Sequence, residues 1–394
     1  MGALNGLKIL DFSTLLPGPY ATLMLADLGA EVLRVTGPNQ YDLVTHWPPQ
    51  IEGSGTTAAA AWLGRNKKTM YLDLKNPAGP QAVRKLISEY DIVIEQFRPG
   101  VMKKLGLDYE TLREVNPRLI YCSLTGYGQT GPLAQRAGHD INYLSRSGNM
   151  AQAGRASTGP VLTDMQIADV AVGAMNSVIG ILAAVQYRHT TGEGQHIDIA
   201  MLDGMIPFST MDGACFLAGA KAPRREGELL NGGGIYDFYE TKDGGYLSVG
   251  SLEPKFFAAL MRGAGFPEWA DGALLKSDPG RVKEALKARL RTKTRDEWIA
   301  IFEPLDACVE PVLSMKEMRD DAQIHARGMV PQVALPLCEG KTVQQLGCPI
   351  RLSACPPEYR HAGYPDGYHT EEVLEKLGYT KAEIAELSGK GPAE

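Results

Sequence analysis

The sequence lacks several features that would assign a function at once. None of its six cysteines stands in a C-x-x-C pair, and its seven histidines form no H-x-H or H-E-x-x-H pattern. These absences argue against a zinc site and against a thioredoxin-like redox centre. We therefore expect reduced, buried thiols and a catalytic site without metal.

Excess positive charge, a basic-then-apolar opening pattern and a long apolar run are also missing. The 40 Lys and Arg residues against 46 Asp and Glu residues give a net charge of -6, which disfavours a nucleic-acid-binding protein. No basic stretch followed by an apolar one opens the chain, so a secretory signal is not expected. The most apolar segment, 170–185, is interrupted by Asn176 and Ser177 and is shorter than the roughly 20 residues that span a bilayer. We expect a soluble, cytoplasmic protein that does not bind membranes.

The first half of the chain alternates strand and helix patterns. Three helical patterns cover 17–30, 78–90 and 165–188. Such alternation is typical of βαβ units and a parallel sheet, and therefore of an α/β fold. The expected strands are 7–13, 31–36, 68–74, 91–97, 119–125 and 195–202.

The character of the sequence changes after about residue 219. Residues 221–234 are polar and Gly-rich, as in a linker, and two short strand patterns then flank a hairpin turn at 242–245. Three amphipathic helical patterns follow at 254–265, 280–292 and 295–305. This part of the chain predicts a smaller α+β domain, and 370–387 predicts two short helices.

Two Gly-rich segments allow more than one interpretation. Residues 126–131 match G-x-G-x-x-G literally, but Pro132 follows where a nucleotide-binding helix would begin. A turn that lets the backbone approach a ligand or another chain is favoured over dinucleotide binding. The run 232–234 is typical of a lid or hinge, and equally of a flexible linker.

Four ionisable residues are candidates for catalysis, and each has a structural alternative. His139 and Asp140 stand where a helix begins, so Asp140 could simply cap that helix. Asp169 stands at the start of a long apolar helix, where a carboxylate is either functional or stabilised by the positive end of the helix dipole. Glu253 lies between a strand and a helix that begins with Pro254, a common position for a structural acid.

Arginines recur near the ends of the early strands. Arg34, Arg65 and Arg98 all occupy such positions. Most exposed basic residues are only solvated charges. Because the carboxyl ends of parallel strands meet at one edge of a sheet, these three could instead converge on a phosphorylated ligand.

Ordered motifs along nearly the whole chain resemble the family III CoA-transferase superfamily of the CaiB–BaiF type. Within it, the chain is most similar to the α-methylacyl-CoA racemases. The motifs that carry the resemblance are LKILDFSTLLPGPYATLMLADLGAEVLRV, LGRNKKTMYLDLK, FRPGVMKKLGL, NPRLIYCSLTGYGQTGP, AGHDINYLSRSGN, QIADVAVGAMNSVIGILAA, GEGQHIDIAMLDG, SVGSLEPKFF, DACVEPVL and HTEEVLEKLGY.

The resemblance implies a particular architecture. A Rossmann-like large domain would comprise 1–220 and a C-terminal return at 331–394, and a small α+β domain would comprise 221–330. Two subunits would interlock as a homodimer with the acyl-CoA between them. The segments 221–234 and 331–365 would cross between the domains.

The resemblance also implies the site. In a racemase, His139 and Asp169 would exchange protons with the substrate while Glu253 assists the histidine. In a transferase, Asp169 alone would be the nucleophile. CoA belongs to the substrate, so no further cofactor is expected. The residues expected to contact it are Arg34, Leu63, Gly64, Arg65, Asn66, Arg98, Gly138, Asp140 and Tyr143.

We expect a racemase that inverts the 2-methyl centre of an acyl-CoA thioester, because His139 and Glu253 accompany Asp169. The alternative is a transferase that moves CoA between carboxylic acids. One feature departs from the racemase pattern, since residues 170–174 replace a Gly-rich run. The pattern therefore leaves the reaction open, and it does not predict the acyl group.

Overall fold

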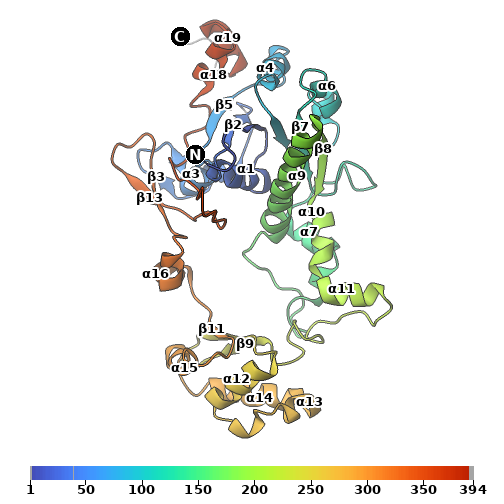
Figure 1. The fold of residues 1–394 in the computed structure, drawn as a ribbon, viewed down its shortest axis with the longest axis vertical. Helices are drawn as coiled ribbons and strands as arrows, with labels where there is room; N and C mark the ends of the chain where they lie inside the picture. Colours follow the sequence, from blue (N-terminus) through green and yellow to red (C-terminus); the bar gives the residue numbers. More distant parts are fainter. Residues whose placement is uncertain (1, 39, 390–394) are drawn as a thin grey trace. The chain divides into compact units, whose positions relative to one another are not determined.

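The computed structural model describes residues 2–38 and 40–389, and it divides the chain into two units (Figure 1). Unit 1 comprises residues 1–147, 164–206 and 323–394, and unit 2 comprises 148–163 and 207–322. The expected domain boundaries at 220 and 330 lie instead at 206 and 322. The sequence also gave no sign that 148–163 belongs to the smaller unit.

Six parallel strands form the central sheet of unit 1. Each arises from one of the six apolar segments expected from the sequence, which confirms the α/β fold with a parallel sheet. In spatial order the strands are β5 (Lys68–Tyr71), β2 (Glu31–Thr36), β1 (Lys8–Asp11), β6 (Ile92–Glu95), β7 (Ile120–Thr125) and β8 (His196–Ala200).

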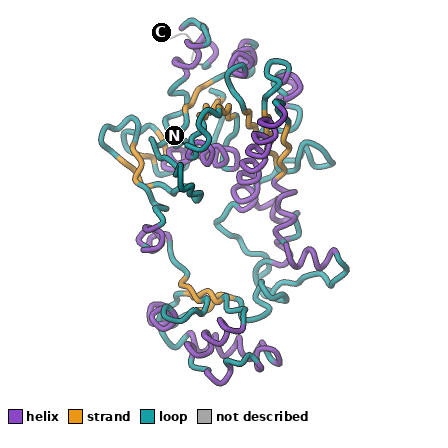
Figure 2. The backbone as a smooth tube through the Cα atoms, in the orientation of Figure 1, coloured by secondary structure: helices purple, strands orange, loops and turns teal. Residues whose placement is uncertain are grey.

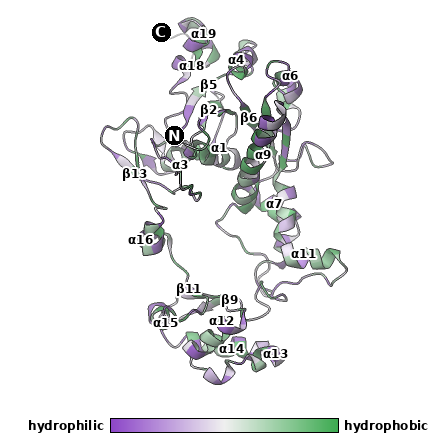
Figure 3. Cartoon of the chain, viewed as in Figure 1, coloured by the Kyte–Doolittle hydropathy of each residue, from purple (hydrophilic) through white to green (hydrophobic). Residues whose placement is uncertain are grey.

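Both faces of this sheet are covered by helices, because successive side chains of a strand point to opposite faces. Ile9 packs with α1 (Pro17–Asp27) and α9 (Met175–Thr191), which are largely hydrophobic in Figure 3. The next residue, Leu10, belongs to the core on the other face. The helices that contribute to that core include α4 (Ala78–Ile87), α18 (Thr370–Lys376) and α19 (Lys381–Leu387).

The C-terminal segment closes the β5 edge of the sheet. The backbone N–H of His369 donates to the Thr69 carbonyl at 2.9 Å, and Lys68 pairs with Glu372 at 2.8 Å. The strand edge therefore meets partners from the far end of the chain, which protects it from unwanted pairing. Residues 345–369, which precede α18, contain no helix or strand (Figure 2).

The helix that carries Asp169 ends three residues beyond the expected 165–188, and it begins as a different type of helix. A π-helix, η1 (Ile167–Ala174), continues directly into α9, so 167–191 is one apolar helix of 25 residues. Our expectation that this segment is too short to span a bilayer was wrong, because its length and composition pass that test. It also packs against β7 and β8, and a core helix of a globular protein passes the same test.

Unit 2 is built on a three-stranded antiparallel sheet. Its strands are β9 (Asp237–Glu240), β10 (Tyr246–Val249) and β11 (Val309–Pro311), with β10 in the centre. The hairpin and the following helices agree with the sequence pattern. The helices that pack on this sheet are α12 (Pro254–Ala264), α14 (Pro279–Leu290) and α15 (Arg295–Phe302).

Ion pairs tie the segment 148–163 and the helix α14 to β9. Arg155 binds Asp237 through two N–H groups at 2.5 and 2.9 Å, which attaches the segment 148–163. Lys283 pairs with Asp237 at 2.7 Å and also donates to the carbonyl of Gly232. The Gly-rich run 232–234, for which the sequence left lid and linker open, is thus anchored at its first residue.

The six cysteines are free thiols, but they are not all buried as we expected. Cys122, Cys338 and Cys348 are buried, whereas Cys215 and Cys308 are exposed. Both exposed thiols belong to unit 2.

Short elements complete the chain. Among the helices, α7 and α10 border the candidate site described below. The short helices are α2 (Leu43–His46), α3 (Ala58–Leu63), α5 (Val101–Lys104), α6 (Tyr109–Arg113), α7 (Asp140–Arg146), α8 (Asn149–Gln152), α10 (Met201–Met205), η2 (Ile206–Phe208), α11 (Thr210–Leu217), η3 (Pro267–Trp269), α13 (Ala273–Ser277), α16 (Met315–Asp320) and α17 (Ala322–Ala326). Two hairpins were not expected: β3 (Gln50–Ile51) with β4 (Thr56–Thr57), and β12 (Gln332–Ala334) with β13 (Thr342–Gln344).

Candidate active site

The strand order places a cavity at the carboxyl edge of the unit 1 sheet. The chain leaves β1 toward β2 on one side, whereas β6 lies on the other side, and such a switch point is where α/β sheets bind ligands. A cavity of about 250 Å³ opens there beside the ends of β1, β6, β7 and β8. Its lining includes Thr14, Leu15, Gln96, Phe97, Arg98, Thr125, Gly126, Arg136, Gly138, His139, Tyr143, Asp169 and Met201.

His139 and Asp169, 30 residues apart in the sequence, both line this cavity. His139 directly precedes α7, and its backbone N–H donates to Asn142 Oδ1 at 2.9 Å. That bond fixes the backbone from which the exposed imidazole projects. The structure therefore brings together two of the three predicted catalytic residues.

Tyr143 forms a wall of the same cavity. Its side chain is buried, and its hydroxyl donates to the carbonyl of Gly138 at 2.6 Å. A Cβ atom at Gly138 would lie 2.8 Å from the Tyr143 ring, and one at Gly126 would lie 2.5 Å away. Glycine is therefore required at both positions for the chain to pass so close to the ring. Gly138 and Tyr143 line the cavity, and their contact with the substrate stays a prediction.

Asp169 occupies the first turn of η1. A π-helical turn inside a longer α-helix is rare and is frequent at functional sites. Close packing accompanies it, because a Cβ atom at Gly173 would lie 2.9 Å from Met201 of α10. The alternation of apolar residues in 170–174 could not reveal this change of helix type.

The surroundings of Asp169 favour its protonated form. Burial, and then the negative charge of Asp140, raise the pKa of Asp169 to about 7. No donor among the described residues bonds its carboxyl group. Its backbone N–H instead donates to Asp140 Oδ1 at 3.0 Å. A carboxyl group that titrates near neutral pH is suited both to accept and to donate a proton.

Two arginines line the cavity without a carboxylate partner among the described residues. Arg98 follows β6, and Arg136 precedes the turn that leads to α7. Gln135 donates to the Pro99 carbonyl at 2.9 Å, which ties the two loops together. The sequence identified Arg98 from its strand-end position but missed Arg136, which lies in a loop with no such pattern.

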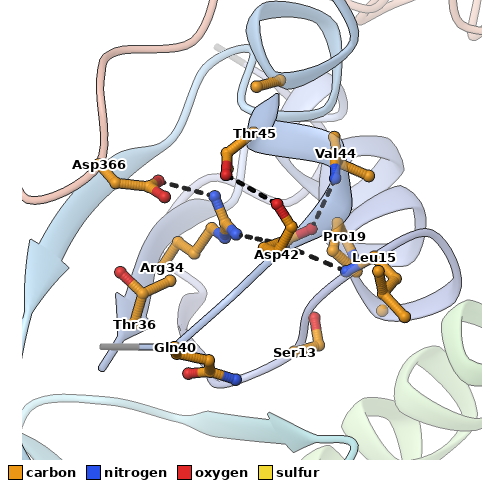
Figure 4. A network of polar contacts seen from close by, with 12 residues as sticks. Ser13, Leu15, Pro19, Arg34, Thr36, Gln40, Asp42, Val44, Thr45 and Asp366 are labelled. Carbon is orange, nitrogen blue, oxygen red and sulfur yellow. Dashed lines mark hydrogen bonds and ion pairs between the residues drawn. The ribbon is translucent and has the colours of Figure 1, made fainter. Parts of the chain in front are cut away.

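Arg34, in contrast, is already occupied. Its guanidinium donates to Asp42 at 2.7 Å and to Asp366 at 2.8 Å (Figure 4). Its Nε atom is buried and has no partner among the residues described. A phosphate at this position would face two carboxylates. The geometry therefore does not offer Arg34 to a phosphate as the sequence predicted.

Arg65 and its neighbours are buried in the fold rather than presented to a ligand. Arg65 is 1% exposed and binds Asp27 through two N–H groups at 2.6 and 3.0 Å. Asn66 donates to the same carboxylate at 2.9 Å. This network leaves Arg65 no exposed donor for phosphate, contrary to the prediction. Leu63 and Gly64 are buried too, beside a void of only about 10 Å³.

A second, larger cavity of about 410 Å³ lies at the same edge of the sheet, beside β2 and β5. Phe97 lines both cavities. The lining is mostly apolar and comprises Phe12, Val35, Thr36, Gly37, Pro38, Gln40, Leu72, Asp73, Leu74, Lys75, Phe97, Val101 and Leu105. The sequence did not single out this region, because buried apolar residues at strand ends look the same with or without a cavity.

Glu253 belongs to unit 2, where it directly precedes α12 and is exposed. Its predicted assistance to His139 remains a prediction from the resemblance. Across the described parts of the chain, no group of three His, Cys, Asp or Glu residues is arranged to hold a metal ion.

A family model described as CoA-transferase family III matches residues 4–370. The chain belongs to this family. It is 35% identical over 390 residues to the α-methylacyl-CoA racemase of Homo sapiens, covering 98% of this chain and 96% of that protein. It is also 34% identical over 385 residues to the succinate–glutarate CoA-transferase of Agrobacterium fabrum (strain C58), covering 95% of each.

Solved structures of family III agree. A CAIB/BAIF family protein from Brucella suis matches with a TM-score of 0.82 and 30% identity, covering 95% of this chain and 99% of that one. The family that the motifs predicted is thus confirmed, and the protein is an enzyme of the family III group. Because both racemases and CoA-transferases are among its relatives, membership does not decide between the two reactions.

Proposed function

We propose that this enzyme inverts the 2-methyl centre of an acyl-CoA thioester. The observation that carries the proposal is that His139 and Asp169 line one cavity, where the pKa of Asp169 is raised to about 7. Inversion needs one group to remove the α-proton and another to return a proton on the opposite face. Both groups work best with pKa values near the working pH.

The proposed mechanism has two proton transfers. The carboxylate of Asp169, or the neutral imidazole of His139, removes the α-proton and leaves an enolate of the thioester. The other group, in its protonated form, returns a proton to the opposite face. The two residues exchange roles when the substrate has the other handedness. The carbon skeleton and the thioester stay intact, so the reaction needs no cofactor beyond the CoA of the substrate.

The two cavities, which share Phe97 in their linings, suit a long, bipartite substrate such as an acyl-CoA. We propose that the thioester lies in the cavity of His139 and Asp169, and that the nucleotide end occupies the larger apolar cavity beyond Phe97. Between these ends lie phosphate groups, which guanidinium groups bind well. Arg98 and Arg136, which have no carboxylate partner in the described structure, are the residues we assign to them.

Replacing Arg98 or Arg136 by alanine should therefore raise KM for acyl-CoA about 10- to 100-fold, the size of one charge-assisted hydrogen bond, with little change in kcat. Steady-state kinetics of each variant measures this. Arg113→Ala is the matched control, because Arg113 is exposed on α6 and pairs with Glu110 at 3.2 Å. Unchanged KM in both variants would place the phosphates elsewhere.

A CoA-transferase is the second candidate, favoured by the 34% identity to the succinate–glutarate enzyme. In that reaction the Asp169 carboxylate would attack the thioester carbonyl, expel the CoA thiolate and form a mixed anhydride. The CoA thiolate would then attack the aspartyl carbonyl of the anhydride, which releases the first acid as a carboxylate and leaves an aspartyl-CoA thioester. The carboxylate of a second acid would attack that thioester and expel CoA, and CoA would finally attack the acyl carbonyl of the new anhydride, which forms the second acyl-CoA and frees Asp169.

The first attack requires ionised Asp169, and so does proton removal by Asp169 in the racemase. We rank the transferase below the racemase because only the racemase also uses His139, which lines the same cavity.

We also propose that the enzyme is an obligate, interlocked homodimer. Large apolar side chains are exposed along 206–217, including Met211 at 63% and Leu217 at 83% exposure. Apolar groups gathered in this way mark an interaction surface. Sedimentation at low concentration should find dimers with no active monomer, since the folded monomer would lack its partner surface. A stable, active monomer would refute this.

The proposed reaction has a direct test. Either pure enantiomer of a 2-methylacyl-CoA, incubated with the enzyme alone, should be converted to equal amounts of both, as measured by chiral chromatography. Retention of the starting configuration after prolonged incubation with active enzyme would overturn the proposal.

A further inference from the structure

Asp140 directly follows the catalytic candidate His139 in the sequence, but its carboxylate contacts the other candidate, Asp169. Asp140 Oδ1 accepts the backbone N–H of Asp169 at 3.0 Å, and the nearby backbone N–H of Ala168 also lowers the pKa of the Asp140 carboxyl group. These are N-terminal N–H groups of η1, which have no partner within the helix. The Asp140 side chain was predicted to contact the substrate, and the structure engages it with the helix that carries Asp169.

The start of a helix usually stabilises a negative charge, because free N–H groups and the helix dipole lie there. Asp169 occupies such a position, yet its carboxyl accepts no hydrogen bond from the described residues. The donors that would stabilise its charge are taken by Asp140. Burial raises the pKa of both carboxyl groups, but backbone N–H groups counteract the rise only at Asp140, so Asp140 ionises before Asp169.

We propose that Asp140 is a positioning residue for Asp169: it occupies the N-terminal donors of η1 and places a second negative charge beside the buried Asp169 carboxyl group, so that this group is available in both its protonated and its ionised form near neutral pH. The inference rests on the proposed function, in which Asp169 must both give and take a proton. Asp140 thus acts on Asp169, whereas its neighbour His139 exchanges protons with the substrate. This arrangement also explains why a catalytic carboxyl group can stand in the first turn of a helix.

Other ionisable groups around Asp169 are accounted for. Arg98, Arg136, His139 and Tyr143 line the same cavity. Of the elements packed against η1, α1 contributes Tyr20 and the Arg65-paired Asp27, and α10 contributes the exposed Asp203. Among these groups, only Asp140 both bonds the Asp169 backbone and raises the pKa of its carboxyl group.

The test compares Asp140→Asn with the wild type. Asparagine keeps an oxygen for the Asp169 N–H but removes the charge, so the apparent pKa of Asp169 should fall by about one unit. The first readout is the pH dependence of α-proton exchange from a 2-methylacyl-CoA into deuterated water. Asp203→Asn removes a nearby exposed carboxylate and is the matched control.

The second readout does not depend on the reaction. Because the folded-state pKa of Asp169 is raised, its protonation stabilises the fold fully below about pH 4, and this stabilisation is lost as the pH rises toward 7. The melting temperature of each protein, relative to the same protein with Asp169→Asn, measures that loss. In Asp140→Asn the loss should be complete about one pH unit earlier.

A shift of the thermal titration in Asp140→Asn but not in Asp203→Asn supports the inference, even if no proton exchange occurs and the proposed function fails. A thermal titration that does not move overturns the inference, even if the enzyme proves to be a racemase. Loss of exchange in Asp140→Asn with an unmoved titration would likewise overturn it, because Asp140 would then act otherwise than through Asp169.

Discussion

Asp169→Asn should lower the rate of inversion about 10²- to 10⁴-fold in both directions, which is the range for loss of a positioned acid or base. Asparagine is similar in shape but carries no proton to exchange. His139→Gln should lower the rate by a similar factor, because each residue serves one face of the α-carbon. Chiral analysis of both enantiomers measures these rates, and saturating substrate separates them from binding.

His189→Gln is the control for the histidine, since His189 is exposed near the end of α9 and does not line the cavity. It should leave the rate unchanged. Glu253 orients rather than transfers in the proposed mechanism, so Glu253→Gln should slow both directions less than either catalytic variant. If His139→Gln retained most of the activity, the two-residue mechanism would be wrong and Asp169 alone would carry the reaction.

Arg65→Met should destabilise the fold by about 3–5 kcal/mol, the effect of leaving one member of a buried ion pair without its partner. Asp27, which is 2% exposed, would lose the two N–H groups that Arg65 donates to it at 2.6 and 3.0 Å. Urea denaturation of the purified protein measures the loss. The effect should be on stability, because Arg65 contacts no cavity that would hold substrate.

The double variant Asp27→Asn with Arg65→Met is the control, since removing both charges of a buried pair is often close to neutral. It should recover much of the lost stability. A stable Arg65→Met protein with a raised KM for acyl-CoA would instead restore the original interpretation of Arg65 as a phosphate ligand.

The contrast among the arginines shows where sequence interpretation reaches its limit. A guanidinium near the end of a strand looks the same whether it is free or paired. Arg34 is paired with Asp366, which lies 332 residues further along the chain, and no local sequence pattern predicts such a contact. Arg98 and Arg136 are free only because no distant carboxylate meets them in the described structure. The sequence therefore identified positions at the sheet edge but not their partners.

Local patterns were reliable where burial alone decides the structure. All six strands of the unit 1 sheet were expected, because the inner strands are mostly buried apolar runs and the edge strand β8 alternates polar and apolar residues. The π-helix was not expected, because an apolar run does not distinguish one helix type from another. Likewise, the segment 148–163 joins unit 2 through Arg155, whose partner Asp237 is 82 residues away.

The central claim is that protons, rather than CoA, are exchanged at Asp169. The most direct measurement incubates the enzyme with a 2-methylacyl-CoA in deuterated water, with and without an acceptor carboxylic acid, and follows both products by mass spectrometry. We expect deuterium at the α-carbon at the same rate in both samples, and no new CoA ester. Transfer of CoA to the acceptor without deuterium, together with trapping of an activated Asp169 by hydroxylamine, would contradict the racemase and establish the transferase.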